Sequence, residues 1–271
     1  MPGLAALSLL ICVCLQAQPA YELLLKGGHV IDPKNKLSGR MDVAIAGGRS
    51  ARVAGDIPAS SAQRVADVSG LVVTPGILDI HVHVYAGTGL KAITGDSSVY
   101  PDGFSFRTGV TTMVDAGSAG WRNFPDFRER VIDRAQTRVL AFLNISGVGM
   151  APKGENNPAD MDPEEAVKMA RRHPDVIVGI KIAHYNRRNW LDVDNALKAA
   201  SELKQPVMVD FGVVGNGRDL ATLLGDKLRP GDIYTHCFSG HRAELLPDKT
   251  LNPAMETGRK RGVIFDIGHG G

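Results

Sequence analysis

The sequence has little cysteine and little excess charge of either sign. Its 271 residues carry 31 Lys and Arg against 29 Asp and Glu, a formal net charge of +2, and no block of basic residues stands out. Nucleic-acid binding therefore has no electrostatic support. The three cysteines, Cys12, Cys14 and Cys237, are too few for a disulfide framework. The fold must rest on an apolar core, for which 44% hydrophobic residues suffice.

The N-terminal apolar run, residues 4–15, is shorter than the roughly 20 residues that cross a bilayer. We expect no integral membrane span. The run has the length of the hydrophobic part of a signal peptide, and the small residues up to Ala20 are typical of a cleavage site. We therefore expect residues 1–20 to be a signal peptide and the protein to be secreted or periplasmic. Because no Lys or Arg precedes the run, a cytoplasmic protein is the alternative.

Residues 21–75 alternate apolar and polar side chains in short runs separated by turn residues. The pairs Gly27–Gly28 and Gly47–Gly48 lie between such runs and predict hairpin turns. This segment is predicted to form a small β-sheet unit, part of a β-sandwich domain.

Residues 76–271 repeat a strand, a loop and a helix. Near-continuous apolar strands alternating with helices indicate a parallel sheet buried on both faces. Seven strands in succession, none opening a GxGxxG motif, favour a (β/α)8 TIM barrel of α/β class that lacks its eighth strand before Gly271. The expected strands are 76–84, 110–117, 138–146, 176–183, 206–212, 232–240 and 262–270, and the expected helices 121–136, 163–173, 192–204 and 252–261.

Several expected strands end in polar residues, and a TIM barrel builds its active site at those ends. His81 and His83 are two residues apart on one strand, so both imidazoles face the same way and suit a transition metal such as zinc. An exposed strand end is the alternative. Asp210 and His236 end the fifth and sixth strands and are also metal-ligand types. Asp115, Asn144, Ser239 and His269 are predicted to contact substrate or support the ligands.

Lys181 lies in VIVGIKIA, among apolar residues only. Burying an unpaired ammonium is costly. The neutral amine can react with carbon dioxide, and the resulting carbamate could bridge two metal ions. The alternative is an ion pair with Asp115, Asp210 or Asp266. Cys237, next to His236, should point away from the metals as a small buried side chain.

With these residues in view, the chain resembles the amidohydrolase superfamily. LLLKGGHVIDP and VTPGILDIHVH are similar to its N-terminal signature, and VDAGSAG, FLNIS, GIKI, THCFSG and DIGHG resemble its dihydroorotase-related deacetylases. The resemblance covers about residues 21–271. It implies a barrel flanked by a small β-sandwich and two Zn²⁺ ions. His81 and His83 would hold the more buried ion, carbamylated Lys181 would bridge the pair, and His236 would hold the second.

The resemblance further implies that a bridging hydroxide attacks an acyl amide or ester of a small acylated substrate, and that an eighth-strand aspartate shuttles the proton. Two departures stand out. Asp210 occupies the position where the group usually has a histidine, and no eighth-strand aspartate occurs before Gly271. A metal-dependent amidohydrolase or deacetylase is the leading hypothesis. A cyclic amidase of the dihydroorotase or hydantoinase type, and a truncated non-catalytic remnant, are the alternatives. The oligomeric state leaves no signal in the sequence.

Overall fold

The computed structural model describes residues 19–85, 98–150, 155–210 and 217–268. The chain divides into two compact units between Pro75 and Gly76. The expected signal peptide lies outside the described residues, except for Pro19 and Ala20, and His269 lies outside them as well. Within the described ranges, no helix is long and apolar enough to cross a membrane.

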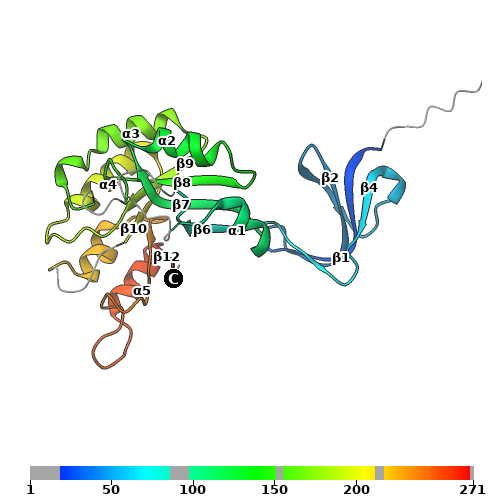
Figure 1. The fold of residues 1–271 in the computed structure, drawn as a ribbon. Coiled ribbons are helices and arrows are strands. Elements are labelled where there is room, and N and C mark those ends of the chain that lie inside the picture. Colours follow the sequence, from blue (N-terminus) through cyan, green and yellow to red (C-terminus); the bar gives the residue numbers. More distant parts are fainter. Residues whose placement is uncertain (1–18, 86–97, 151–154, 211–216, 269–271) are drawn as a thin grey trace, which may run out of the picture. The chain divides into compact units, whose positions relative to one another are not determined.

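The first unit is a five-stranded mixed sheet (Figure 1). Its central strand, β1, runs antiparallel to β2 and parallel to both β4 and β5, and β2 pairs with β3. A small core of Leu24, Ala44 and Ile57 stabilises it. The strands are β1 (Tyr21–Asp32), β2 (Leu37–Ala46), β3 (Arg49–Ala54), β4 (Ala62–Asp67) and β5 (Val72–Val73).

The two glycine pairs of this unit have different roles. Gly47 and Gly48 connect β2 to β3 as a hairpin turn, as the sequence predicts. The hairpin prediction at Gly27 and Gly28 is wrong, because both lie inside β1, where the pairing with β2 shifts register. A Cβ on Gly28 would lie 2.7 Å from Cγ2 of Val73. Close approach of a neighbouring strand, rather than a reversal of the chain, therefore requires glycine there.

The second unit is an incomplete TIM barrel, as expected. Among the described residues of this unit, seven parallel strands pair in the order in which they follow along the chain. A small apolar cluster of Val114, Ala116, Phe142, Met208 and Ile233 is formed by the strands alone, and a larger core includes residues of the helices. The strands are β6 (Ile77–Val82), β7 (Val110–Gly120), β8 (Arg138–Asn144), β9 (Ile177–Ile182), β10 (Val207–Val209), β11 (Ile233–Tyr234) and β12 (Ile264–Phe265).

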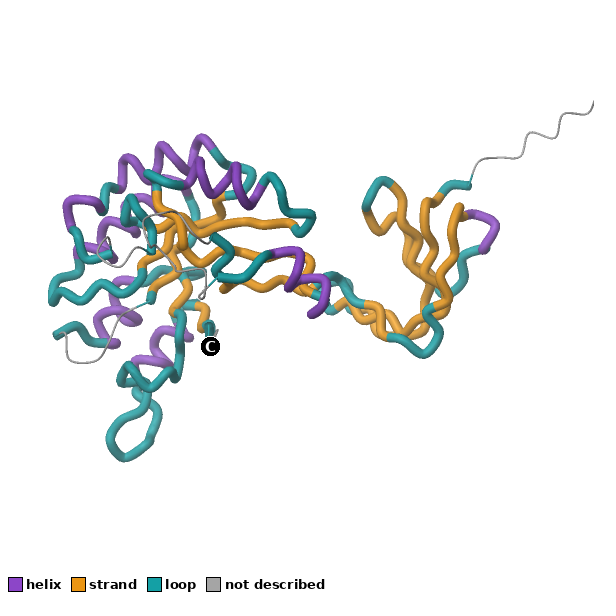
Figure 2. The backbone as a smooth tube through the Cα atoms, in the orientation of Figure 1, coloured by secondary structure: helices purple, strands orange, loops and turns teal. Residues whose placement is uncertain are grey.

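Helices alternate with these strands along the chain (Figure 2). Asp162 caps α3 by accepting hydrogen bonds from the main-chain N–H groups of Glu164 and Glu165. The helix expected at 121–136 is shorter in the structure. Its α-helical part, α2, covers Phe124–Phe127 and continues directly into a π-helical turn at Arg128–Ile132. Two further elements were not predicted, α1 and a π-helical turn at Thr222–Lys227. The α-helices are α1 (Pro101–Thr108), α2 (Phe124–Phe127), α3 (Pro163–Arg172), α4 (Leu191–Leu203) and α5 (Pro253–Lys260).

One buried carboxylate ties the first unit together. Asp42 is 2% exposed and accepts hydrogen bonds from the main-chain N–H groups of Gly27 and Ile57, at 2.8 and 2.9 Å. The ammonium of Lys26 donates to Asp42 and also to the exposed Asp56, both at 2.8 Å. The two carboxylates share one cation and differ in burial.

We predict that Asp42→Ala lowers the free energy of opening of the first unit by about 2–4 kcal/mol, because it leaves buried N–H groups without an acceptor. Asp56→Ala is the matched control and should change that free energy by less than about 0.5 kcal/mol. Hydrogen exchange followed by mass spectrometry, on peptides covering β1 and β2, measures both. Equal protection of these peptides from hydrogen exchange in the two variants would contradict the stabilising role of Asp42.

Candidate functional site

Polar side chains from the parallel strands meet at one edge of the seven-stranded sheet. Because all seven strands run the same way, their carboxyl ends lie together. The residues concerned are His81 in β6, His83 directly after it, Lys181 in β9, Asp210 directly after β10, His236 two residues after β11 and Asp266 directly after β12.

Three histidines come close together at this edge. The ring centroid of His81 lies 4.8 Å from that of His236 and 5.8 Å from that of His83. Nδ1 of His81 lies 2.8 Å from a carboxylate oxygen of Asp266, and Nδ1 of His83 lies 2.9 Å from the hydroxyl of Ser118. Nε2 of His81 is buried and has no hydrogen-bond partner among the described residues. Imidazoles held through Nδ1 leave Nε2 for a ligand, as in protein metal sites.

The electrostatics of the site favour neutral imidazoles. Burial lowers the pKa of His83 to about 3 and that of His236 to about 4, with the nearby Lys181 acting in the same direction. Burial also lowers the pKa of His81, against the opposing effect of Asp266. Neutral imidazoles are the form that binds a metal ion.

Lys181 is fully enclosed. It is 1% exposed, and the described hydrogen bond of its Nζ is a 3.6 Å contact to the thioether sulfur of Met208. Among the described residues, no carboxylate accepts a hydrogen bond from it, so the structure does not form the alternative ion pair. Burial lowers the pKa of the Lys181 amine to about 8, although Asp266 and Glu155 act in the opposite direction. The amine is thus unusually easy to deprotonate.

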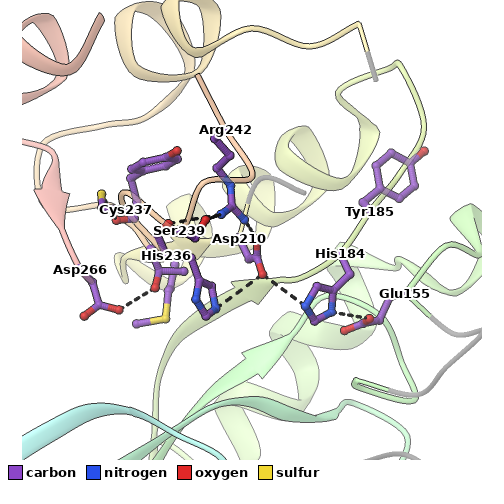
Figure 3. Close-up of polar contacts among 12 residues, drawn as sticks. Glu155, His184, Tyr185, Asp210, His236, Cys237, Ser239, Arg242 and Asp266 are labelled. Carbon is purple, nitrogen blue, oxygen red and sulfur yellow. Dashed lines mark hydrogen bonds and ion pairs between the residues drawn. The ribbon is translucent and has the colours of Figure 1, made fainter. Parts of the chain in front are cut away.

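Asp210 is the centre of a second polar group (Figure 3). Its Oδ1 accepts a hydrogen bond from Nη2 of Arg242. Its Oδ2 lies 3.4 Å from Nε2 of His184 and 3.7 Å from Nε2 of His236. Nδ1 of His184 in turn lies 2.9 Å from Oε2 of Glu155.

Four residues of this site were not assigned to it from the sequence: Glu155, His184, Arg242 and Asp266. Glu155 and Arg242 lie outside the strands, so strand alternation cannot place them. His184 follows Lys181 by three residues, and alternation would put the two on opposite faces. The strand ends at Ile182, however, and His184 has a φ of 53°, so alternation no longer applies. Asp266 appeared only as an alternative partner for Lys181.

Two expected substrate contacts are deeply buried. The carboxylate of Asp115 accepts hydrogen bonds from the main-chain N–H groups of Val84 and Ser118. Asn144 donates to the carbonyl of Gly117 and accepts from the N–H of Ser146. These contacts use both side chains to join the segments after β6 and β8 to the C-terminal part of β7, and contact with a substrate stays a prediction.

The remaining expected residues lie around the sixth strand and at the chain's end. The hydroxyl of Ser239 accepts a 3.0 Å hydrogen bond from Arg242, next to the Asp210 group. Cys237 is buried, as expected. His269 lies outside the described residues. Substrate contact by Ser239 or His269 stays a prediction.

The donors at this edge fit a divalent metal ion. In the described part of the chain, no three His, Cys, Asp or Glu side chains are already arranged to hold one. The fit rests instead on chemistry: the buried, unpartnered Nε2 of His81, the low pKa of the three imidazoles, and carboxylates that fix the ligand orientation. Imidazole and carboxylate donors together suit zinc and similar ions.

Comparison with known proteins adds independent information. No protein-family model matches the chain. The chain is 33% identical over 240 residues to a deacetylase of Agrobacterium fabrum, which covers 85% of this chain and 57% of that protein. It is 33% identical over 264 residues to a deacetylase of Enterococcus faecalis, covering 92% and 66%. A solved structure of an adenine deaminase matches with a TM-score of 0.75 at 28% identity, covering 92% and 66%. The chain therefore spans between 57% and 66% of the length of these proteins.

The geometry around Lys181 yields a prediction. A Cβ on Gly117, which has a φ of 86°, would lie 2.6 Å from Cβ of Lys181. Gly109 has a similar φ of 76°, but its Cβ would meet only Cδ1 of Ile77 at 4.0 Å. Alanine at either position costs about 1–2 kcal/mol for the left-handed backbone. Gly117→Ala should lose a further 1–3 kcal/mol or so by crowding Lys181. Urea unfolding of the two variants measures the difference, and equal losses would show that Lys181 is not packed against Gly117.

Proposed function

The chain belongs to the amidohydrolase superfamily, and we propose that its protein is a metal-dependent hydrolase that removes an acyl group from a small amide or ester. The single observation that carries this proposal is the cluster of His81, His83 and His236 at the carboxyl ends of parallel strands, beside the buried Lys181. The deacetylase names of the two relatives support the acyl chemistry.

We propose that the site takes two zinc ions. His81 and His83 would hold the first, His236 and Asp210 would contribute to the second, and a modified Lys181 would supply a ligand to both. When bound, such ions act as Lewis acids that activate water and polarise a carbonyl. The neutral state of these imidazoles supports the proposal, because a proton on the ligating nitrogen would compete with the metal ion.

The residues around the ligands have defined tasks in this proposal. The Asp266 carboxylate and the Thr235 hydroxyl, 2.8 and 2.9 Å from Nδ1 of His81, keep the proton on Nδ1 and turn Nε2 inward. Ser118 positions His83 in the same way. These contacts fix the rings before a ligand arrives, which lowers the cost of binding.

Lys181 is proposed to carry a carbamate. The ammonium first loses one proton to water, and the neutral amine then adds to the carbon of carbon dioxide. An N–C bond forms as one C=O π bond opens onto oxygen, and the nitrogen loses a second proton to water, so that an anionic carbamate replaces the cation. The support is its burial without a carboxylate partner among the described residues and the ease with which its amine loses a proton. A carboxylate at that position would add the anionic oxygen donors that the imidazoles lack.

Substitution of Lys181 tests the function. Lys181→Ala should reduce hydrolysis of N-acetyl and O-acetyl small acids at least about 100-fold and reduce bound metal, because the bridging carboxylate is lost. Short carboxylates such as acetate or propionate should restore part of the activity by occupying the vacated space. Lys181→Arg is the matched control and should not be rescued, because guanidinium stays charged and fills that space. Full activity in Lys181→Arg would show that the lysine serves only as a cation.

A further inference from the structure

We propose that His184 is a ligand of the second metal ion, together with Asp210 and His236, and that Glu155 holds its imidazole in place. The inference rests on the proposed metal-dependent function and adds a residue to it. It accounts for the aspartate on the fifth strand, where the resemblance implies a histidine. In this chain the missing imidazole is supplied from the end of β9.

The distances around Asp210 are close to those between ligands of one metal ion. Zinc binds nitrogen and oxygen ligands at about 2.0–2.2 Å, so two ligands of a tetrahedral ion lie roughly 3.3–3.6 Å apart. Oδ2 of Asp210 lies 3.4 Å from Nε2 of His184 and 3.7 Å from Nε2 of His236. Both separations exceed the usual 2.7–3.2 Å or so of an N–H···O hydrogen bond. The first lies within the range expected for two ligands of one cation, and the second is just beyond it.

The hydrogen bond of His184 to Glu155 determines which atom faces Asp210. Nδ1 of His184 lies 2.9 Å from the carboxylate of Glu155, so Nδ1 carries a proton and donates it. With Nδ1 donating to Glu155, Nε2 is the ring nitrogen left to face Oδ2 of Asp210, 3.4 Å away. A metal ion between these two atoms would be bound by both, and the carboxylate behind the imidazole is the usual support of a metal-binding histidine.

Asp210 is held in an orientation that leaves one oxygen for a metal. Arg242 donates from Nη2 to Oδ1 of Asp210, and from Nη1 to the carbonyl of His236 at 3.3 Å and to the hydroxyl of Ser239 at 3.0 Å. One guanidinium thus fixes both the carboxylate and the loop that carries His236. The other carboxylate oxygen, Oδ2, is directed at the two imidazoles (Figure 3).

The backbone is also shaped for this group. His184 and His236 have φ angles of 53° and 56°, in the left-handed region that residues other than glycine rarely adopt. Such conformations cost free energy and are concentrated at functional sites. The side chain of His184 is 53% exposed, so its ring can turn toward a bound ion without disturbing the core. A small rotation is required, since the described donors do not yet surround one point.

Metal stoichiometry tests the inference. Purified protein loaded with Co²⁺ should contain about two equivalents of cobalt per chain by elemental analysis. Its visible spectrum should show the absorption bands of Co²⁺ in a low-symmetry protein site. His184→Ala should lose one equivalent and change those bands, whereas His81→Ala should lose the other. Glu155→Gln should weaken the second equivalent by about 10–100-fold. His241→Ala, which removes an exposed histidine nearby, should keep both.

The outcomes separate the inference from the function on which it rests. His184→Gln gives a second variant that keeps a polar side chain, and far-UV circular dichroism checks that each variant is folded. Two equivalents and an unchanged cobalt spectrum in both His184 variants would overturn the inference and leave the proposed function standing. A protein that binds one equivalent, lost in His81→Ala and kept in His184→Ala, would overturn it in the same way. A protein that binds no cobalt would overturn the proposed function itself.

Discussion

The burial of the Lys181 amine is the constraint on which the rest of this site depends. The amine lies beside Met208, in register with it across β9 and β10, where Met208 belongs to an apolar cluster of the strands. A cation there, without an anionic partner, is expensive. Deprotonation removes that cost, whereas an anion at this position would need bound cations beside it, which the neighbouring imidazoles would help to hold. Under the proposed function, the charge of this one side chain therefore separates a metal site from an ordinary polar edge.

Around this centre, hydrogen bonds fix the orientation of the proposed ligands. Asp266 and Ser118 fix the rings of His81 and His83, while Glu155 and Arg242 fix His184 and Asp210. The buried Asp115 ties the loop after β6 to the C-terminal part of β7 through main-chain hydrogen bonds. The supporting residues come from different strands and loops, so the site exists only once the sheet has formed. Stability of the barrel and geometry of the site are therefore linked.

The strands and several helices were accessible from the sequence because their signals are local. Short apolar segments that alternate with helical stretches marked β6 to β12, although β10, β11 and β12 are shorter than predicted. Pro163 with its acidic neighbours marked the start of α3. Helix α1 was missed because Gly103 and scattered aromatic residues give PDGFSFRT no clear apolar face. His81 and His83 were found through strand alternation, which relates residues two apart. His184, Arg242 and Glu155 reach the site through backbone turns and long-range packing, and no local pattern encodes those contacts.

The central claim is that the strand ends converge to bind metal through imidazoles and a modified lysine. Diffraction from crystals grown with zinc, measured at the zinc absorption edge, tests this directly. The account predicts an anomalous peak at about 2.0–2.1 Å from Nε2 of both His81 and His83. It also predicts electron density for a carboxylate extending from Nζ of Lys181. Zinc found only at the protein surface, with an unmodified lysine amine beside Met208, would contradict it.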